Sequence, residues 1–359
     1  MISNKTFVIA EAGVNHNGSI DMARRLIDAA ADAGADAVKF QTFRAERLAS
    51  ALAPKAEYQI AATGSGESQF EMLKRLELSE EAHWQLLEHS LDRGIEFMST
   101  AFDIESLHFL VDRIGIKRIK LPSGEITNGP FLLAAAKASL PLILSTGMSD
   151  LGEIRRALSV VAFGLLGEDA APSVQSFDAA LKSSRAQDLL KENVVILQCV
   201  TEYPASIADA NLRAMGTISR EFRLPVGYSD HTLGMSASLA AVALGAMVIE
   251  KHFTLDCRLP GPDHRASLEP GHLKNLVRCI REVGESLGDG RKVPAPAELR
   301  NLPVARKSLA AARAIRKGEI FTAENISIKR PGTGRSPIDY WAVLGSPASR
   351  DYKPDDLIE

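Results

Sequence analysis

Short apolar runs alternate with amphipathic segments along most of the chain. The apolar runs predict eight buried strands: Phe7–Ala10, Ala37–Phe40, Phe97–Ser99, Arg118–Leu121, Leu142–Leu144, Val194–Gln198, Val226–Tyr228 and Met247–Glu250. The segments between them place apolar residues on one helical face: Ile20–Ala33, Glu80–Arg93, Pro130–Ala138, Glu153–Ala162, Ser236–Leu244 and Gly271–Leu287. Strands that alternate with helices in this way are typical of parallel β/α units.

Eight β/α units over about 280 residues predict an α/β protein with a (β/α)₈ TIM barrel. A doubly wound open sheet is the alternative that the same pattern allows. Two connections are longer than the rest, Arg44–Gln69 and Leu165–Glu192. Long connections in barrels cover active sites or are inert insertions, and the pattern does not separate the two.

The alternation stops near Gly288, where the sequence "GDGRKVPAP" reads as a linker. We therefore predict a barrel domain over residues 1–287, a linker over 288–300 and a second domain over 301–359. Short apolar runs separated by glycine turns indicate that this second domain is rich in β structure. A domain this small is marginally stable alone, so we expect it to dock on another surface.

Composition narrows the possible functions. The 359-residue chain has 45% hydrophobic and 24% charged residues, a net charge of −3 and a pI of about 6.3. Without a basic excess, neither nucleic acid nor a membrane surface is expected as a partner. Three cysteines without a CxxC motif fit a reducing compartment. No signal peptide and no apolar run of membrane-spanning length is apparent, so we expect a cytoplasmic protein.

Polar or ionisable residues follow every predicted strand. Barrel enzymes place their active-site groups at these strand ends. The residues in question are Glu11, Lys39, Gln41, Thr100, Lys120, Ser123, Ser145, Tyr203, Ser229, His231, Lys251 and His252. A lysine inside an apolar strand is costly without an anionic partner. Lys39 and Lys120, with the hydroxyls and glycine N–H groups nearby, predict a site for a small ligand with two anionic groups.

His231 and His252 end the last two predicted strands, which are neighbours in a barrel. Two imidazoles near carboxylates form a plausible site for Mn²⁺, Zn²⁺ or Fe²⁺. His16 follows the first strand and is a further candidate for lining the pocket. We expect His83, His89 and His108 to be solvated residues of helices.

Two other functions remain open at this point. A Schiff-base aldolase would use one of the strand lysines and would not need the histidine pair. A non-catalytic carbohydrate-binding protein would use the C-terminal domain, although the ring of polar strand ends argues against it.

Several segments resemble the sialic acid, or nonulosonic acid, synthases. They are "IAEAGVNHNGSIDMARRLIDAAADAGADAVKFQTF" (9–43), "IKLPSGEITN" (119–128), "ILSTGMSD" (143–150), "GYSDHT" (227–232), "EKHFT" (250–254) and "RLPGPDHRASL" (258–268). The C-terminal "AIRKGEIFTAENISIKRPGTG" (314–334) resembles the antifreeze-like, or SAF, domain of that family. The resemblance covers nearly the whole chain in the family's order.

The resemblance implies a condensation of phosphoenolpyruvate with an N-acylated amino-hexose and water, with release of phosphate. It implies a divalent metal held by His231 and His252, most often Mn²⁺, with Mg²⁺ or Co²⁺ as alternatives. Glu11, His252 and Asp263 would be the catalytic residues. Lys39, Thr100 and Lys120 would bind the carboxylate of phosphoenolpyruvate, and Ser123, Ser145 and Ser229 its phosphate. The amino-hexose would contact Gln41, Tyr203 and Asp263.

The resemblance also implies a domain-swapped homodimer in which Arg330 reaches into the partner subunit's site. The amino-hexose would be N-acetylmannosamine or 2,4-diacetamido-2,4,6-trideoxymannose, and pseudaminic acid synthesis is a less favoured alternative. Thr201 stands where some members of the family have asparagine.

Overall fold

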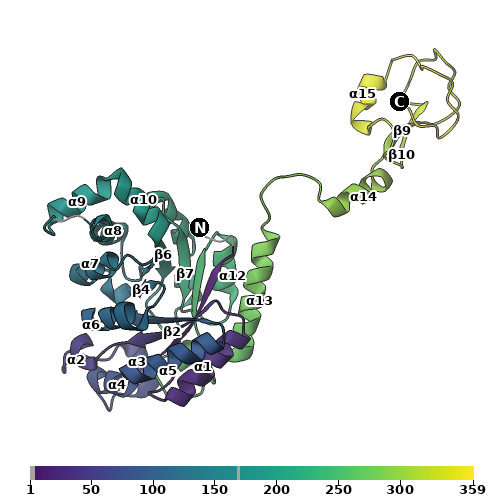
Figure 1. The fold of residues 1–359 in the computed structure, drawn as a ribbon. Helices are drawn as coiled ribbons and strands as arrows, with labels where there is room; N and C mark the ends of the chain where they lie inside the picture. Colours follow the sequence, from purple (N-terminus) through teal and green to yellow (C-terminus); the bar gives the residue numbers. More distant parts are fainter. Residues whose placement is uncertain (1–4, 168–169) are drawn as a thin grey trace. The chain divides into compact units, whose positions relative to one another are not determined.

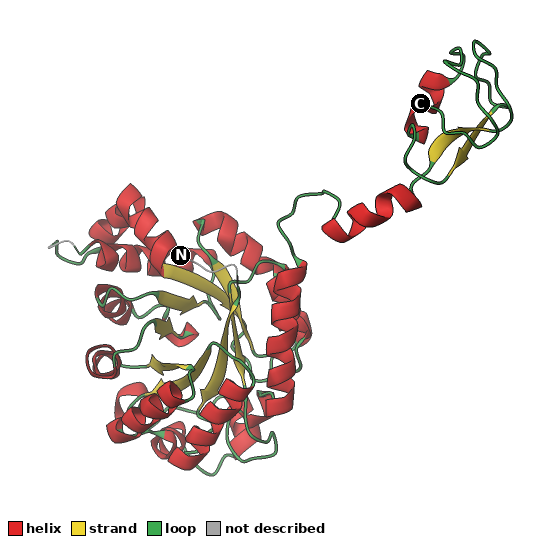
Figure 2. Cartoon of the chain, turned by 45° about the vertical axis from the view of Figure 1, so that its right-hand side comes forward, coloured by secondary structure: helices red, strands yellow, loops and turns green. Residues whose placement is uncertain are grey.

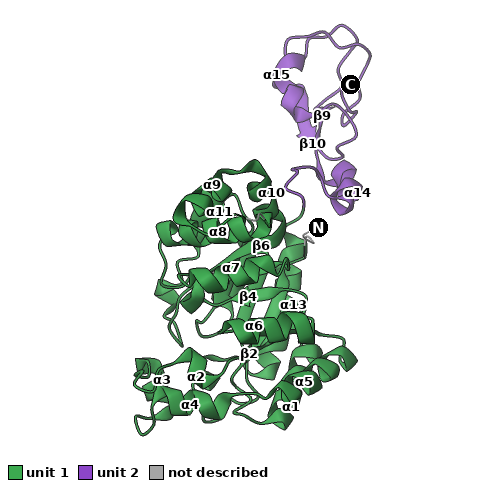
Figure 3. Ribbon diagram, turned by 60° about the vertical axis from the view of Figure 1, so that its left-hand side comes forward, with its two compact units in different colours: residues 1–288 green, residues 289–359 purple. Residues whose placement is uncertain are grey.

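A computed structural model describes residues 5–167 and 170–359. Residues 1–4 of the predicted barrel domain, and residues 168–169 of the second long connection, lie outside the described residues. The chain forms two compact units, Met1–Gly288 and Asp289–Glu359, which Figure 3 colours separately. Each unit is described by itself below.

The first unit is the predicted TIM barrel. Its strands are β1 (Phe7–Gly13), β2 (Ala37–Thr42), β3 (Glu96–Ala101), β4 (Ile119–Leu121), β5 (Leu142–Ser145), β6 (Val194–Cys199), β7 (Val226–Asp230) and β8 (Val248–His252). All paired strands are parallel, in the order β3-β2-β1-β8-β7-β6-β5-β4, and β3 also packs beside β4. Because β1 pairs with both β2 and β8, the sheet curls into a nearly closed ring, and the open-sheet alternative is wrong.

The helices of this unit mostly surround the ring of strands on the outside (Figures 1 and 2), and a few short ones lie in the connections at the carboxyl ends of the strands. They are α1 (Ile20–Asp32), α2 (Ala45–Leu48), α3 (Glu57–Thr63), α4 (Gln69–Leu76), α5 (Glu80–Asp92), α6 (Ile104–His108), η1 (Phe109–Ile114), η2 (Ser123–Glu125), α7 (Gly129–Lys137), α8 (Leu151–Leu166), α9 (Val174–Lys182), α10 (Ser184–Asn193), η3 (Ile207–Asp209), α11 (Arg213–Phe222), α12 (Ser236–Ala243), η4 (His264–Ala266) and α13 (Pro270–Ser286). The first long connection thus contains α2 to α4, and the second contains α9 and α10.

The covering helices follow the apolar spacing of the sequence. In α1, the buried residues Ala23, Leu26, Ile27 and Ala30 recur every three or four positions and form one face. The Ser19 hydroxyl caps this helix by accepting a hydrogen bond from the Met22 N–H.

Side chains alternate between the two faces of each barrel strand. Along β1, Val8 and Ala10 point outward to the helices, whereas Ile9 points into the barrel. The barrel interior is filled at this level by one layer of apolar residues: Ile9, Ala37, Met98, Ile143, Leu197 and Val248. The next inward-facing residue on each strand, two positions later, therefore forms the floor of the space above this layer.

The second unit contains α14 (Pro296–Ala305), β9 (Ser308–Ala311), β10 (Ile326–Lys329), η5 (Pro337–Asp339) and α15 (Tyr340–Val343). Strands β9 and β10 are antiparallel. Leu309, Ile315, Phe321 and Tyr352 are among the residues of its own small core. Helix α14 begins within the segment for which the sequence predicted a linker.

Among the described residues, no helix combines the length and the apolar character that crossing a membrane requires.

Candidate active site

A cavity of about 320 Å³ opens above the apolar layer, at the carboxyl ends of the barrel strands. All twelve residues of the first unit to which the family resemblance assigned a role line it: Glu11, Lys39, Gln41, Thr100, Lys120, Ser123, Ser145, Tyr203, Ser229, His231, His252 and Asp263. The thirteenth, Arg330, lies in the second unit, where its Nε donates to the Ala305 carbonyl oxygen. Its predicted role in a partner's site stays a prediction.

The floor of the cavity is a buried cluster of charges. The Lys39 ammonium lies 2.6 Å from a Glu11 carboxylate oxygen and 3.5 Å from Glu250, and it donates to the Thr100 hydroxyl at 2.9 Å. Lys120 contacts the other oxygen of Glu250 at 3.3 Å. Glu250 therefore joins the two lysines, and each of these charged side chains is no more than 6% exposed.

No role was predicted for Glu250 from the sequence, although its position in the strand indicated one. Glu250 precedes His252 by two positions in the same strand, so both side chains point to the same face of the sheet. Lys251 between them points to the opposite face. There it forms a fully buried ion pair with Asp230 at 3.0 Å, and it has no part in the cavity.

The two carboxylates in the floor ionise differently. Burial opposes ionisation of both, but Lys120, Lys39 and the Ser229 hydroxyl outweigh burial at Glu250 and hold its pKa well below the usual range. Burial raises the pKa of Glu11 to about 7; Lys39 opposes this rise and Glu250 adds to it. Glu11 is therefore the carboxylate that can take up and release a proton near neutral pH.

A group of hydroxyls lies over β4 to β6. The Ser123 hydroxyl accepts from the Gly147 N–H at 3.0 Å and lies 3.1 Å from the Cys199 thiol. The buried hydroxyls of Ser145 and Thr201 have no hydrogen-bond partner in residues 5–167 and 170–359. Buried polar groups are normally paired, so these two hydroxyls mark a place for a ligand's polar atoms.

A Cβ at Gly147 would overlap the Thr201 hydroxyl and lie 2.8 Å from the Ser123 hydroxyl. Only glycine therefore fits at this point of the loop without displacing the two hydroxyls. We call Ser123, Ser145, Gly147 and Thr201 the hydroxyl cradle.

His231 and His252 face one another across the adjacent β7 and β8 ends, with ring centroids 5.6 Å apart. The Nδ1 of His231 is 2.5 Å from the Val200 carbonyl oxygen, which can only accept, so Nδ1 carries the proton and Nε2 keeps its lone pair. The buried Nδ1 of His252 has no hydrogen-bond partner in the described residues. Burial lowers the pKa of His231 to about 4 and that of His252 well below its ordinary value, so both rings are neutral near pH 7.

These two imidazoles fit a divalent metal, because neutral rings with free lone pairs are what such an ion binds. In the part of the chain that the structure describes, no three His, Cys, Asp or Glu side chains converge as ligands. The remaining positions would belong to water or to substrate oxygens.

Asp263 and two tyrosines form the wall beside the histidines. The Tyr203 ring lies 4.1 Å from the His231 ring and 5.0 Å from the Tyr58 ring, centroid to centroid. Burial raises the pKa of Asp263 to about 6, so this carboxyl also exchanges its proton near neutral pH.

The first long connection covers the cavity. Tyr58 and Gln59 of α3, with Gln69, Met72, Leu73 and Leu76 of α4, line it together with Leu48 of α2. The sequence left open whether this connection was functional, because it has no strand or barrel-helix periodicity.

His16 does not line the cavity. It is fully buried, packs 6.1 Å from the Phe40 ring, and accepts a hydrogen bond from the Gly18 N–H at Nδ1. The expectation that His83 is solvated is also wrong. It is 1% exposed and bonds through Nε2 to Thr42 and through Nδ1 to the Ser79 carbonyl oxygen, because α5 turns this face to the barrel.

We expect the burial of His16 to make stability fall in acid. Burial, with His83 and His264 nearby, lowers the pKa of His16 to about 4 from 6.5. The unfolded chain takes up a proton below about pH 6.5 and the folded chain does not until about pH 4. The free energy of unfolding should therefore fall by about 1.4 kcal/mol per pH unit in that window.

Urea unfolding at about pH 7 and pH 5, in the natural protein and in His16→Gln, measures this effect. The variant should lose less stability on acidification by about 1–2 kcal/mol. An equal loss in both proteins would show that His16 does not contribute.

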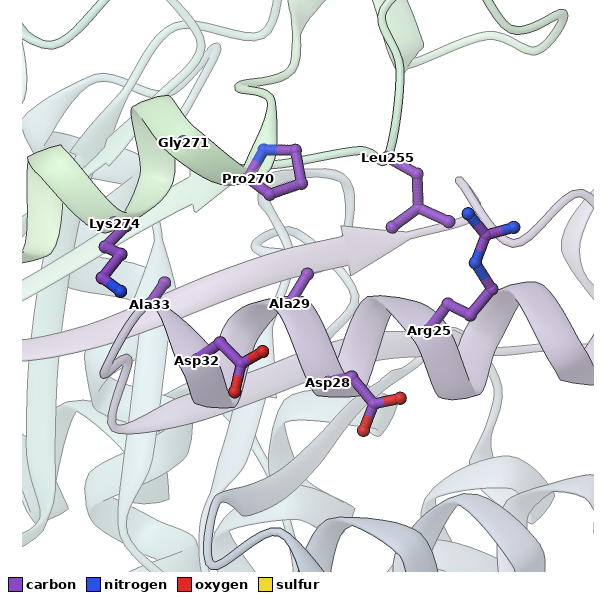
Figure 4. A pocket seen from close by; sticks show the side chains of 9 residues that line it. All are labelled: Arg25, Asp28, Ala29, Asp32, Ala33, Leu255, Pro270, Gly271 and Lys274. Carbon is purple, nitrogen blue, oxygen red and sulfur yellow. The ribbon is translucent and has the colours of Figure 1, made fainter.

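A separate pocket of about 410 Å³ lies on the outside of the barrel, between α1 and the start of α13. Figure 4 shows the side chains of Arg25, Asp28, Asp32 and Lys274 around it. It is open and shallow, is lined by none of the strand-end residues, and is distinct from the candidate active site.

Comparisons with known proteins agree with a barrel followed by a small C-terminal domain. The family model described as the NeuB family matches residues 26–292, and the SAF domain model matches residues 306–359. The chain is 47% identical to the N,N'-diacetyllegionaminic acid synthase of Campylobacter jejuni over 99% of both chains. It is also 47% identical to the enzyme of the same name from Legionella pneumophila, over 95% of this chain and 89% of that one.

Among solved structures, the chain is similar to an N-acetylneuraminic acid (sialic acid) synthetase from Leptospira borgpetersenii that was crystallised with citrate. The TM-score is 0.66 and the identity 34%, over 83% of this chain and 90% of that one. These matches cover both units in order, and the chain belongs to the NeuB family, with a SAF domain at its C-terminal end.

Proposed function

We propose that this enzyme condenses phosphoenolpyruvate with an N-acylated amino-hexose and water, giving a nonulosonic acid and phosphate. The observation that carries the proposal is the pair of buried lysines, Lys39 and Lys120, joined by Glu250 beneath an unfilled hydroxyl cradle. Two adjacent anion sites of this kind suit a small molecule that carries both a carboxylate and a phosphate. Two of its relatives are named N,N'-diacetyllegionaminic acid synthases.

Each end of phosphoenolpyruvate has its own partners in this proposal. Lys39, Lys120 and the Thr100 hydroxyl hold the carboxylate. Ser123, Ser145 and Ser229 bind the phosphate, and the Thr201 hydroxyl extends this set. The two lysines are no more than 4% exposed, and a charged contact is stronger at such buried positions than in water.

The reaction then proceeds by electron flow from phosphoenolpyruvate. The electron pair of its C2–C3 double bond forms a bond from C3 to the sugar's aldehyde carbon. The aldehyde oxygen takes up a proton, and Asp263 is the nearby donor. Water adds to the electron-deficient C2 and gives its proton to Glu11, whose pKa of about 7 suits that role. The C2–O bond to phosphate then breaks, the C2 hydroxyl becomes the ketone of the product, and its proton leaves with the phosphate.

His231 and His252 would hold a divalent metal, with Mn²⁺ the first candidate and Mg²⁺ or Co²⁺ the alternatives. When bound, such an ion acts as a Lewis acid that polarises the sugar's aldehyde. Tyr203 and Gln41 line the same cavity and orient the sugar's hydroxyl groups.

A reconstitution experiment tests the proposal. The protein is incubated with phosphoenolpyruvate, Mn²⁺ and each of N-acetylmannosamine, 2,4-diacetamido-2,4,6-trideoxymannose and the pseudaminic acid precursor. Phosphate and a nonulosonic acid of the expected mass should form in equal amounts with one or two of these sugars. No product with any sugar, together with borohydride trapping of pyruvate on Lys39 or Lys120, would favour the Schiff-base alternative.

We expect Gly147→Ala to raise the KM for phosphoenolpyruvate by about 10- to 100-fold, because the added methyl group fills the hydroxyl cradle. The KM for the amino sugar should change little. Steady-state kinetics with each substrate varied in turn measure the difference. Gly152→Ala, at the start of α8 and outside the cavity, is the matched control, and equal kinetics for both variants would contradict the assignment of the cradle.

We also propose a homodimer in which the SAF domain of one chain caps the barrel of the other. Connections at the carboxyl ends of the barrel strands expose the apolar side chains of Leu52, Ile207 and Leu233. The SAF unit exposes Ile338 and Trp341, which are 79% and 76% exposed. Apolar groups this accessible on both units favour a contact that buries them.

Mixing inactive His231→Ala and Arg330→Ala chains tests the swap. A heterodimer of the two would contain one site with both natural residues, so up to about a quarter to a half of the activity should return, depending on how subunits exchange. No recovery in a heterodimer proven by native mass spectrometry would count against it. The free cysteines and the substrate class fit the cytoplasm as the place of action.

A further inference from the structure

One side of the active-site cavity is formed by a continuous group of apolar side chains, whereas most of the other lining residues are polar or charged. Six residues form this apolar wall: Val14, Leu48, Met72, Leu73, Leu76 and Phe102. They come from the ends of β1 and β3 and from α2 and α4. Phe43 packs behind them, with its ring edge-on to Phe102 at 6.1 Å.

Most of the apolar wall lies across the barrel from the hydroxyl cradle. The cradle belongs to β4, β5 and β6. Val14 follows β1, and α2 and α4 come after β2; in a ring of eight strands β1 is opposite β5 and β2 is opposite β6. Phe102 follows β3, which is next to β4. The histidine pair ends β7 and β8, to one side. A sugar whose aldehyde lies at the histidines and whose partner lies in the cradle must therefore extend its far carbons toward the apolar wall.

The wall is held in place by its own contacts. Ser68 and Glu71 form a capping box at the start of α4. The buried Lys55 ammonium donates to the Thr63 hydroxyl, the Gly64 carbonyl oxygen and Glu67. A preorganised apolar surface discriminates between substrates better than a mobile one, since it does not rearrange to solvate a polar group.

One polar group beside the wall is already engaged. The Gln59 side-chain oxygen accepts from the Ala56 N–H at 3.0 Å and from the Gln69 amide at 3.3 Å. Hydroxyl groups pressed against the six apolar side chains would lose water without gaining a partner from them, which costs free energy. Methyl groups at the same place would be buried favourably.

We propose that the apolar wall is the specificity determinant for the amino sugar, and that it selects methyl groups, including the methyl of an acetamido substituent, over hydroxyls at the sugar's far carbons. This inference rests on the proposed function. Between the two candidate sugars, it favours 2,4-diacetamido-2,4,6-trideoxymannose, which has a C6 methyl and a second acetamido group, over N-acetylmannosamine, which has hydroxyls at both positions.

The test compares kcat/KM for the two sugars in the natural protein and in Leu73→Gln. The natural protein should prefer the trideoxy sugar by about 100-fold, the order of discrimination that an apolar pocket achieves against an added hydroxyl. Leu73→Gln, which offers a hydrogen-bonding amide at a half-buried position, should reduce that preference by about 10-fold. Calorimetric titration of each sugar should show the same change in Kd without turnover.

Two further variants keep the result interpretable. Leu48→Gln, on a different helix of the same wall, should reduce the preference in the same direction if Leu73→Gln fails to fold. Leu91→Gln, on the outer face of α5 where Leu91 is 65% exposed, should leave it unchanged.

The possible outcomes separate this inference from the proposed function. Turnover of both sugars with equal efficiency, or a preference for N-acetylmannosamine, would overturn the role of the wall and leave the condensation intact. A preference that survives both wall variants would also overturn it. No turnover of either sugar would instead count against the proposed function.

Discussion

Replacing Lys120 with methionine should lower kcat/KM for phosphoenolpyruvate by about three orders of magnitude. The substitution removes one of the two cations that receive the carboxylate, and it leaves Glu250 facing the substrate with one lysine instead of two. Truncating one partner of a buried charge pair costs several kcal/mol, because the remaining charge stays buried without its counter-ion. Here that charge also repels the incoming anion.

Steady-state kinetics, with thermal unfolding in parallel, measure the effect. Lys117→Met, three residues earlier and exposed, is the matched control and should behave as the natural protein. The double variant Lys120→Met/Glu250→Gln should recover stability but not binding, because it removes the negative charge that Lys120 balanced without restoring the cation. A Lys120→Met protein that is stable and retains its KM for phosphoenolpyruvate would show that this lysine does not bind the substrate.

Removing divalent metal should lower turnover by about 1,000-fold or more, since loss of a Lewis acid costs several kcal/mol of transition-state stabilisation. Dialysis against a chelator, followed by addition of Mn²⁺, Mg²⁺ or Co²⁺, measures both the loss and the recovery. Calorimetric titration of Mn²⁺ should show that His252→Ala weakens binding at least about 10-fold, whereas His272→Ala, on the exposed start of α13, does not. Full activity in chelator would exclude the role proposed for His231 and His252.

The fold was predictable because the signals for it are local. Each strand is a short apolar run, and each covering helix carries a stripe such as Ala23, Leu26 and Ile27. Barrel sites lie at the carboxyl ends of strands, and this rule predicts from the sequence alone that Glu11, Lys39, Lys120 and His252 lie close together.

Other parts of the site were not predictable in this way. Glu250 was missed because its importance comes from contacts with lysines on two other strands, although the two-residue alternation from His252 already placed it inward. Tyr58 and four residues of the apolar wall lie in the connection between β2 and α5, which departs from the alternation of strands and barrel helices, so only the folded chain shows which side chains face the cavity. His83 was misjudged because polar residues on helices are usually exposed, and here Thr42 and the Ser79 carbonyl oxygen satisfy both ring nitrogens.

The position of isotope from labelled water tests the central claim most directly. In the proposed reaction, water adds to C2 of phosphoenolpyruvate and the C2–O bond breaks. In H₂¹⁸O, the released phosphate is therefore predicted to carry no ¹⁸O. The label should enter the nonulosonic acid instead. ³¹P NMR of the phosphate and mass spectrometry of the acid give both results from one reaction. Phosphate that contains ¹⁸O, or no phosphate release with any amino sugar, would contradict the condensation proposed for this site.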